Sequence, residues 1–179
     1  MTSNENEIKL DVGCGPAPHE GYIGVDTIKY SEKIVKFNLE DIPKEKLPFE
    51  NESIDEIICY HTLEHVDNPM QVVEEFYRIL KPGKKLIIKV PYFAHNTANV
   101  PIHKNYWSFR SKMFFDSSYF ETPMKWTSCK MSHKWGSSWK GFVINLPFEF
   151  LINLVGYDLY ERFFCYMRPI FEITFEITK

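Results

Sequence analysis

The sequence lacks closely spaced cysteines, an apolar leader and a strong net charge. Its four cysteines, Cys14, Cys59, Cys129 and Cys165, form no C-x-x-C pair, so we expect free thiols rather than paired ones. Residues 1–7 are polar and contain no secretory signal segment, so we expect a cytoplasmic protein with a flexible tail over residues 1–7. The formal net charge is −3, from 21 basic and 24 acidic residues, so no global field attracts nucleic acid or an anionic membrane.

Long uninterrupted apolar runs and internal repeats are missing as well. The aromatic-rich stretch after residue 144 contains Pro147, Glu149 and Asp158, which argue against a membrane span. The 179 residues are 44% hydrophobic and 16% aromatic, which is enough for one sizeable core. We therefore expect a single globular domain over residues 1–179.

The chain is organised around residues 8–16, which read I-K-L-D-V-G-C-G-P. A short apolar strand containing Asp11 runs into a turn with Gly13 and Gly15, where the backbone can pass close to a bulky group. A second predicted strand ends in Asp26, so two acids stand at successive strand ends. Burying both in a core would cost free energy, and a polar ligand is the simpler interpretation. The glycine pair alone fits a plain loop equally well.

Short connections follow both of these strands. A parallel crossover normally takes about a dozen residues or more. Here the two connections consist only of residues 16–21, which include two prolines, and of residues 27–33. One face of the predicted sheet therefore lacks its usual helices. We expect the apolar C-terminal region, a second copy of the chain or a partner subunit to cover that face, because an exposed one would be a large apolar patch.

The remaining elements follow from apolar patterning and from turn residues. A helix is expected from Asn68-Pro69 to Pro82-Gly83, because the apolar residues between them recur at helical spacing and form a core stripe. The other predictions are strands at 34–37, 54–60, 86–90 and 121–133, a long loop at 92–109, helices at 111–119 and 145–166, and an antiparallel strand at 170–178.

These pieces occur in a recognisable order: L-D-V-G-C-G at 10–15, L-P-F at 47–49, L-E-H at 63–65 and R-I-L-K-P-G at 78–83. The sequence resembles the class I S-adenosylmethionine-dependent methyltransferases, specifically the small methyltransferase type 11 family, over about residues 8–91. The resemblance implies a Rossmann-like α/β fold with a seven-stranded, mostly parallel sheet, an antiparallel last strand and, here, reduced crossover helices in the N-terminal half. It also implies that residues 122–166 are a variable insertion on the substrate side.

The resemblance assigns S-adenosylmethionine as the cofactor and places its parts along the strand ends. The Gly13-Cys14-Gly15 backbone would pack on the methionine part, Asp11 would hold its amino group, and Asp26 would take the ribose hydroxyls. Asn38 and Leu39 would flank the adenine, and Tyr60 and His61 would lie beside the sulfonium. The family usually has Asp where this chain has Asn38, and Asp41 is the rival candidate for that position.

Methyl transfer from a sulfonium depends mainly on positioning, with a base where the acceptor must lose a proton. His61, His95 and His103 are the candidates, because imidazole titrates near neutral pH. His103 is favoured because H-K-N-Y-W-S at 103–108 resembles a family segment that often carries a histidine. Each of the three also fits a loop or capping role, and His65 is interpreted as structural. The acceptor is expected to be small or medium-sized.

Three other interpretations stay open. His61, Glu64 and His65 satisfy the H-x-x-E-H spacing of zinc hydrolases, but that chemistry requires a helix and the motif directly follows a strand, so no metal is expected. A non-catalytic module that binds S-adenosylmethionine is the second. Finally, residues 124–140 mix lysines with tryptophans, which fits nucleic acid or an anionic acceptor, although a solvated face over packed tryptophans is favoured.

Overall fold

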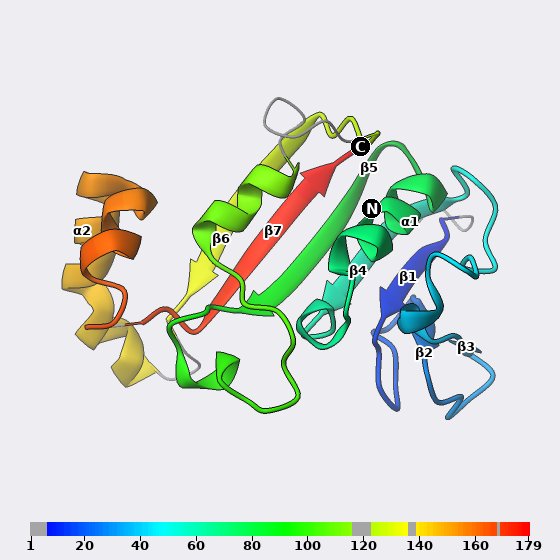
Figure 1. Ribbon diagram of the computed structural model, residues 1–179, viewed down its shortest axis with the longest axis horizontal. Helices are drawn as coiled ribbons and strands as arrows, with labels where there is room; N and C mark the ends of the chain where they lie inside the picture. Colours follow the sequence, from blue (N-terminus) through cyan, green and yellow to red (C-terminus); the bar gives the residue numbers. More distant parts are fainter. Residues whose placement is uncertain (1–6, 116–122, 136–138, 168) are drawn as a thin grey trace.

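The computed structural model describes residues 7–115, 123–135, 139–167 and 169–179, so the predicted flexible tail lies outside it except for Glu7. Within these residues a seven-stranded sheet has the order β3-β2-β1-β4-β5-β7-β6 (Figure 1). Its strands are β1 (Lys9–Val12), β2 (Ile23–Asp26), β3 (Ile34–Lys36), β4 (Ile54–Tyr60), β5 (Leu80–Pro91), β6 (Ser128–Lys134) and β7 (Glu172–Thr178). β1 to β5 pair in parallel, whereas β7 is antiparallel to β5 and β6. The predicted Rossmann-like sheet with an antiparallel last strand is confirmed.

The first two crossovers are as short as expected. Residues 13–22 and 27–33 contain turns and bends but no helix. Because β1 to β5 are parallel, their carboxyl ends meet at one edge of the sheet, the lower edge in Figure 1, where the loop after β5 also lies. Ligands of open α/β sheets bind outside these strand ends.

Helix α1 (Pro69–Ile79) joins β4 to β5. Pro69 starts it, as proline can at a first helical position, but Asn68 makes no capping side-chain bond. The helix ends at Ile79 rather than at Pro82-Gly83, because Leu80 is already extended and pairs with Ile54 as the first residue of β5. β5 is consequently longer than the predicted 86–90.

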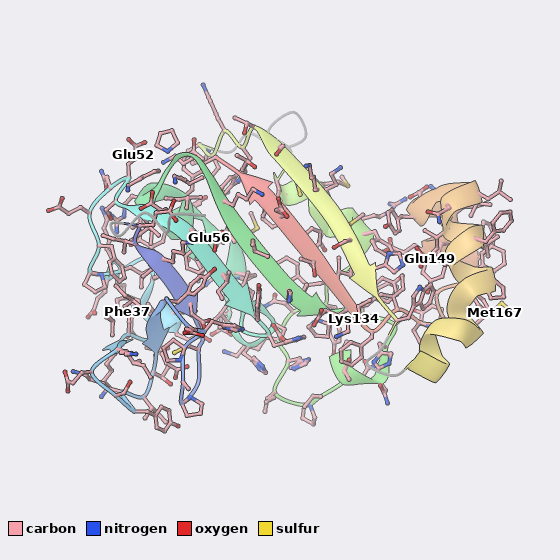
Figure 2. All side chains as sticks on the ribbon, turned by 180° about the vertical axis from the view of Figure 1, so that it is seen from behind. Phe37, Glu52, Glu56, Lys134, Glu149 and Met167 are labelled. Carbon is pink, nitrogen blue, oxygen red and sulfur yellow. The ribbon has the colours of Figure 1, made fainter. Side chains whose placement is uncertain are left out.

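The two faces of the sheet differ sharply in chemistry. Leu10, Ile57, Leu86 and Ile177 stand in register on one face, are fully buried and belong to the core that includes α1. The next row, on the opposite face, is Lys9, Glu56, Lys85 and Thr178. Figure 2 looks onto this open face and labels Glu56 and Lys134. The expectation that this face would be a large apolar patch if left uncovered is therefore wrong, because alternation puts mainly charged and hydroxyl side chains there.

The C-terminal region does not cover the open face either. Helix α2 (Trp139–Phe163) lies beyond β6 at the end of the sheet (Figures 1 and 2), and Gly156, with φ +79°, interrupts it. In place of the predicted helix 111–119 there is a 3-10 helix, η4 (Phe109–Phe115), and residues 116–119 lie outside the described range. β6 begins at Ser128 instead of 121, α2 at Trp139 instead of 145, and β7 at Glu172 instead of 170.

The cysteine prediction holds, since Cys14, Cys59, Cys129 and Cys165 are all free thiols. Among the described residues, no helix combines the length and apolarity that a bilayer crossing requires.

Candidate functional site

The carboxyl ends of β1 to β4 surround a cavity of about 340 Å³, which we name the strand-tip hollow. Its apolar lining consists of Val25, Phe37, Leu39 and Val66. Its other lining residues are Gly13, Asp26, Thr27, Asn38, Glu40, His61, Thr62 and His65. An apolar slot with a few convergent polar groups is the usual form of a small-molecule site. Five predicted cofactor residues, Gly13, Asp26, Asn38, Leu39 and His61, therefore meet in one place.

Gly13 is held against the turn that follows β4. Its φ of +75° favours glycine, and its N–H donates to the Val25 carbonyl at 2.8 Å. A Cβ on Gly13 would lie 2.0 Å from Thr62 Oγ1, whose hydroxyl donates to the Tyr60 carbonyl at 3.0 Å. The bulky group beside this glycine is thus a threonine of the same chain. The predicted contact with the methionine part of a cofactor stays a prediction.

Asp26 is fixed at the tip of β2 by backbone donors. One carboxylate oxygen accepts from the Gly15 N–H at 2.8 Å, and the other accepts from the Ile28 N–H at 3.3 Å and the Thr27 hydroxyl at 3.2 Å. Gly15 does not line the hollow, but it positions the carboxylate that does. Among the residues that the structure describes, no cation pairs with this carboxylate.

Asn38 caps the 3-10 turn η1 (Leu39–Asp41), because its Oδ1 accepts from the Glu40 N–H at 3.2 Å. Leu39 is buried beside it and also lines the hollow. Asp41 does not line the hollow, so the geometry favours Asn38 over its rival.

Asp11, Cys14 and Tyr60 lie next to the hollow without lining it. Asp11 is buried and accepts from the backbone N–H and Nδ1 of His19, at 2.9 and 2.7 Å. Burial, with the charges of Asp11 and Asp26, raises the pKa of the Cys14 thiol to about 11, so the thiol stays protonated at neutral pH. Tyr60 points to the open face, where the Lys89 ammonium lies 4.0 Å from its ring centroid.

His61 bridges two acids from distant parts of the chain. Its Nε2 lies 2.8 Å from Glu172 Oε2, and its Nδ1 lies 3.5 Å from Glu64 Oε1. The hydrogen bonds to Glu172 and Glu64 raise the pKa of His61 to about 9. The imidazole therefore carries a proton at neutral pH, and in that state it donates rather than accepts one.

The other two predicted catalytic histidines lie in the loop after β5. His95 caps the 3-10 turn η3 (Asn96–Ala98), packs on Phe171 and does not line the hollow. His103 packs edge-on against His65, with ring centroids 4.7 Å apart. His65, interpreted from the sequence as structural, does line the hollow. The catalytic assignments of His61, His95 and His103 stay predictions.

The zinc-hydrolase alternative requires His61 and His65 one turn apart on an α-helix. The structure has instead a three-residue 3-10 turn, η2 (Leu63–His65), preceded by His61 at φ +51°. The helical requirement is not met.

In the segment 124–140, the described part resembles a solvated face. Trp126 is buried, edge-on to Tyr77, and the Trp135 N–H donates to Glu149 at 2.6 Å, while Lys125, Lys130 and Lys134 are exposed. Trp126 and Trp135 are therefore used in packing, and the side chains of residues 136–140 lie outside the described set.

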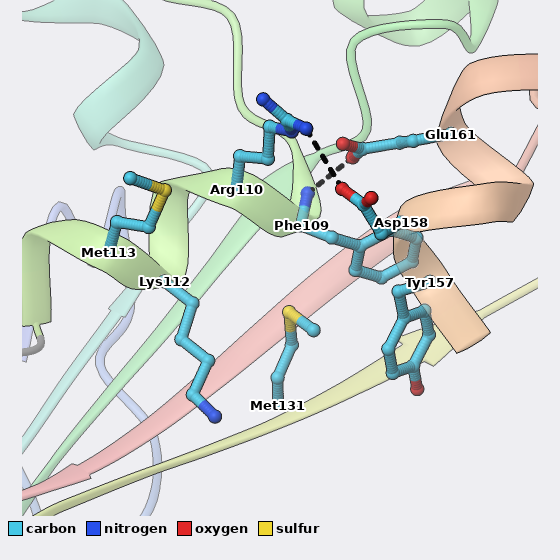
Figure 3. Close-up of a pocket in the computed structure, with 8 residues that line it drawn as sticks. All are labelled: Phe109, Arg110, Lys112, Met113, Met131, Tyr157, Asp158 and Glu161. Carbon is cyan, nitrogen blue, oxygen red and sulfur yellow. Dashed lines mark hydrogen bonds and ion pairs between the residues drawn. The ribbon is translucent and has the colours of Figure 1, made fainter.

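A second cavity, of about 380 Å³, lies between η4, β6 and α2 (Figure 3), and we name it the α2 hollow. It is lined by Phe109, Arg110, Lys112, Met113, Met131, Tyr157, Asp158 and Glu161, and it shares no lining residue with the strand-tip hollow. The Arg110 guanidinium lies 2.9 Å from Asp158, and Glu161 accepts from the Phe109 N–H at 2.6 Å. This cavity falls partly in the predicted insertion 122–166, whose substrate-side role stays a prediction.

Sequence reasoning missed the other residues that line the strand-tip hollow, among them Phe37, Thr62 and His65. It also missed Glu172, the hydrogen-bond partner of His61. Only His65 carried a signal, through the L-E-H segment, and Glu172 meets His61 across 111 residues of sequence. That contact exists because β7 inserts beside β5.

Comparison with known proteins gives consistent results. Residues 10–88 match the family described as Methyltransferase domain. An uncharacterised protein of Methanocaldococcus jannaschii is 37% identical over 87 residues, 47% of this chain and 42% of that one. A sterol 4-C-methyltransferase of Caenorhabditis elegans is 29% identical over 110 residues, 48% of this chain and 31% of that one. The chain thus spans less than half the length of these two relatives.

A solved structure described as a SAM-dependent methyltransferase, from Archaeoglobus fulgidus, superposes with a TM-score of 0.65 and 18% identity, covering 98% of this chain and 87% of that one. The fold is therefore that of the class I S-adenosylmethionine-dependent methyltransferases. The match of residues 10–88 to the methyltransferase domain family confirms the resemblance seen in the sequence.

Proposed function

We propose that the strand-tip hollow binds S-adenosylmethionine and that the protein transfers its methyl group to a small or medium-sized acceptor. The observation that carries this proposal is the convergence of Gly13, Asp26, Asn38 and His61, from four strand ends, on one hollow within this fold.

The lining residues fit an adenosyl ligand. Phe37, Leu39 and Val66 offer apolar surface for a base. The Asp26 carboxylate has about four lone-pair sites, of which three are used by its own chain, so it can still accept from a hydroxyl. When bound, S-adenosylmethionine supplies a methyl group already activated for transfer, so this chain has mainly to position the acceptor.

A single-turnover experiment tests the proposal. Purified protein is mixed with radiolabelled S-adenosylmethionine and an extract of small molecules, and S-adenosylhomocysteine is measured. Its formation, lost on boiling the protein, supports the enzyme. Tight binding with no product would favour the non-catalytic module. Absence of binding would remove both.

For the open face, we propose that any second copy or partner subunit binds through charged side chains. The Lys85–Glu176 pair, with Nζ and Oε1 2.6 Å apart, is typical of that face. An association through charged side chains would weaken as the salt concentration rises. Sedimentation at low and high salt measures it, and a mass unchanged from the monomer at both would dismiss it.

A further inference from the structure

Glu64 is a buried acid with an unused oxygen. Its side chain is 1% exposed, in the η2 turn below the loop that follows β5. Oε2 has no hydrogen-bond partner among the described residues, and Oε1 has only His61 Nδ1 at 3.5 Å. Burial of a carboxylate is costly unless it is paired, hydrogen-bonded or bound to a metal.

Two imidazoles beside Glu64 are oriented by backbone carbonyls. His65 Nδ1 lies 3.3 Å from the Ile102 carbonyl, and His103 Nδ1 lies 3.1 Å from the Ala98 carbonyl. A carbonyl only accepts, so in each ring Nδ1 must carry a hydrogen, and in the neutral form of the ring Nε2 then has the free lone pair. Histidines that bind metals are oriented in this way by their second nitrogen.

The three side chains already converge. One potential ligand atom from each of Glu64, His65 and His103 lies within 4.8 Å of the other two. Ligand atoms about 2.1 Å from one ion can be at most about 4.2 Å apart, so a small rotation of a half-buried imidazole completes the set. The loop is also pinned in place, because the N–H groups of Lys104 and Asn105 donate to the Glu64 carbonyl at 2.7 and 3.2 Å.

We propose that Glu64, His65 and His103 bind a first-row divalent metal ion at the edge of the strand-tip hollow. Two imidazoles and one carboxylate suit Zn²⁺ or Fe²⁺ and leave coordination positions open. His65 also lines the hollow, which places the site at its edge. The site differs from the H-x-x-E-H set, because His61 is not a ligand and no α-helix is needed.

The ion has a function only if the proposed methyl transfer is correct. An acceptor hydroxyl bound to the ion would have its pKa lowered and would give its proton to solvent water or to a hydroxide bound to the same ion, so no histidine base would be needed. In that case His103 acts as a ligand and not as the proton acceptor.

Metal binding is measured on protein without a polyhistidine tag. Co²⁺ is titrated in and followed by visible absorption, and Zn²⁺ binding is measured by calorimetry. We expect one equivalent of each. His65→Ala, His103→Ala and Glu64→Gln should each weaken binding by about 100-fold or more, because losing even a group that only orients a ligand costs about 10-fold to 100-fold.

His133→Gln is the matched control. His133 Nε2 lies 2.9 Å from Glu149, so it is also an imidazole beside a carboxylate, but it is not part of the cluster. This variant should bind Co²⁺ like the wild type. Circular dichroism checks folding, and His103→Ala, in the loop, decides the matter if Glu64→Gln fails to fold.

No Co²⁺ or Zn²⁺ binding by the wild type would overturn the proposal and leave His61 as the partner of Glu64 among the described residues. Binding that survives all three ligand substitutions, or falls equally in His133→Gln, would also overturn it. S-adenosylmethionine affinity is measured separately: His103 does not line the hollow, so His103→Ala should lose metal and keep the cofactor. Metal bound by a wild type without cofactor affinity would contradict the proposed function alone.

Discussion

The strand-tip hollow and the α2 hollow are similar in volume, about 340 and 380 Å³, but they use their polar groups differently. In the α2 hollow Asp158 is paired with Arg110 and with Arg162, at 2.9 and 3.1 Å. In the strand-tip hollow Asp26 accepts from two backbone N–H groups and the Thr27 hydroxyl, and no cation in the described part of the chain pairs with it. The difference teaches that volume does not identify a ligand site in this molecule. The contrast lies in the two aspartates: Asp26 is fixed in place without a paired cation among the described residues, which leaves its carboxylate able to bind a ligand.

The tightest part of the strand-tip hollow is the Gly13 turn, and its substitution should have the largest effect. Gly13→Ala combines a left-handed residue, costing about 1–2 kcal/mol, with a clash against Thr62, costing about 1–3 kcal/mol. We expect a loss of about 3 kcal/mol in the free energy of unfolding, measured in urea.

Gly15→Ala is the matched comparison. Its φ is +62°, but a Cβ there meets nothing within 4 Å, so only the backbone term of about 1–2 kcal/mol applies. Equal losses in the free energy of unfolding for the two variants would mean that contact with Thr62 does not restrict the residue at position 13.

The Asp26 carboxylate should matter next, because a hydrogen bond to a charged group contributes about 1.5–3 kcal/mol. Asp26→Asn is expected to weaken S-adenosylmethionine binding about 10-fold to 100-fold by calorimetry. Asp158→Asn, in the α2 hollow, should leave the affinity unchanged. If both variants weakened binding alike, the distinction between the hollows would fail.

Asp55, near the start of β4, is an acid that is fully paired. Burial alone would raise its pKa, but bonds from Lys81, the Ile8 N–H and Lys84 outweigh burial and hold the pKa at about 2, below the usual 3.8. The contribution of ionised Asp55 to the stability of the folded state is therefore complete above about pH 4 and is lost as the pH falls toward 2.

Asp55→Asn should reduce the free energy of unfolding by about 1 kcal/mol at pH 7, since the partly exposed lysines are screened by solvent. Urea unfolding at pH 7, 4 and 2 measures the difference from the wild type. A difference that grew on acidification would contradict the sign.

The smallest effect is expected at the surface of the α2 hollow. Asp158 is 60% exposed, and its pairs with Arg110 and Arg162 lie in water. Asp158→Asn should leave the free energy of unfolding nearly unchanged. A clear loss, measured by urea unfolding, would show that this ion-pair cluster supports the α2 packing.

The sequence predicted the N-terminal half better than the C-terminal half, for physical reasons. β4 was located at 54–60 because its apolar residues, above all Ile57, Ile58 and Cys59, follow a polar loop and identify a buried strand. Asp26 was located because a strand tip is a local feature. The extension of β5 back to Leu80 was missed, because pairing with Ile54 overrode the turn expected at Pro82-Gly83.

The contacts that shape the site could not be read from local patterns. Thr62 against Gly13 and Glu172 against His61 join segments that meet only once the sheet has formed. The open face was mispredicted for a similar reason. The short crossovers correctly indicated missing helices, but only the pairing register shows that Lys9, Glu56 and Lys85 share the uncovered side.

Calorimetric titration of the purified wild-type chain with S-adenosylmethionine, and then with S-adenosylhomocysteine, is the most direct test of the strand-tip hollow. We predict saturable binding of one molecule per chain for both compounds. A flat titration of the folded protein with either compound would contradict the assignment of this hollow.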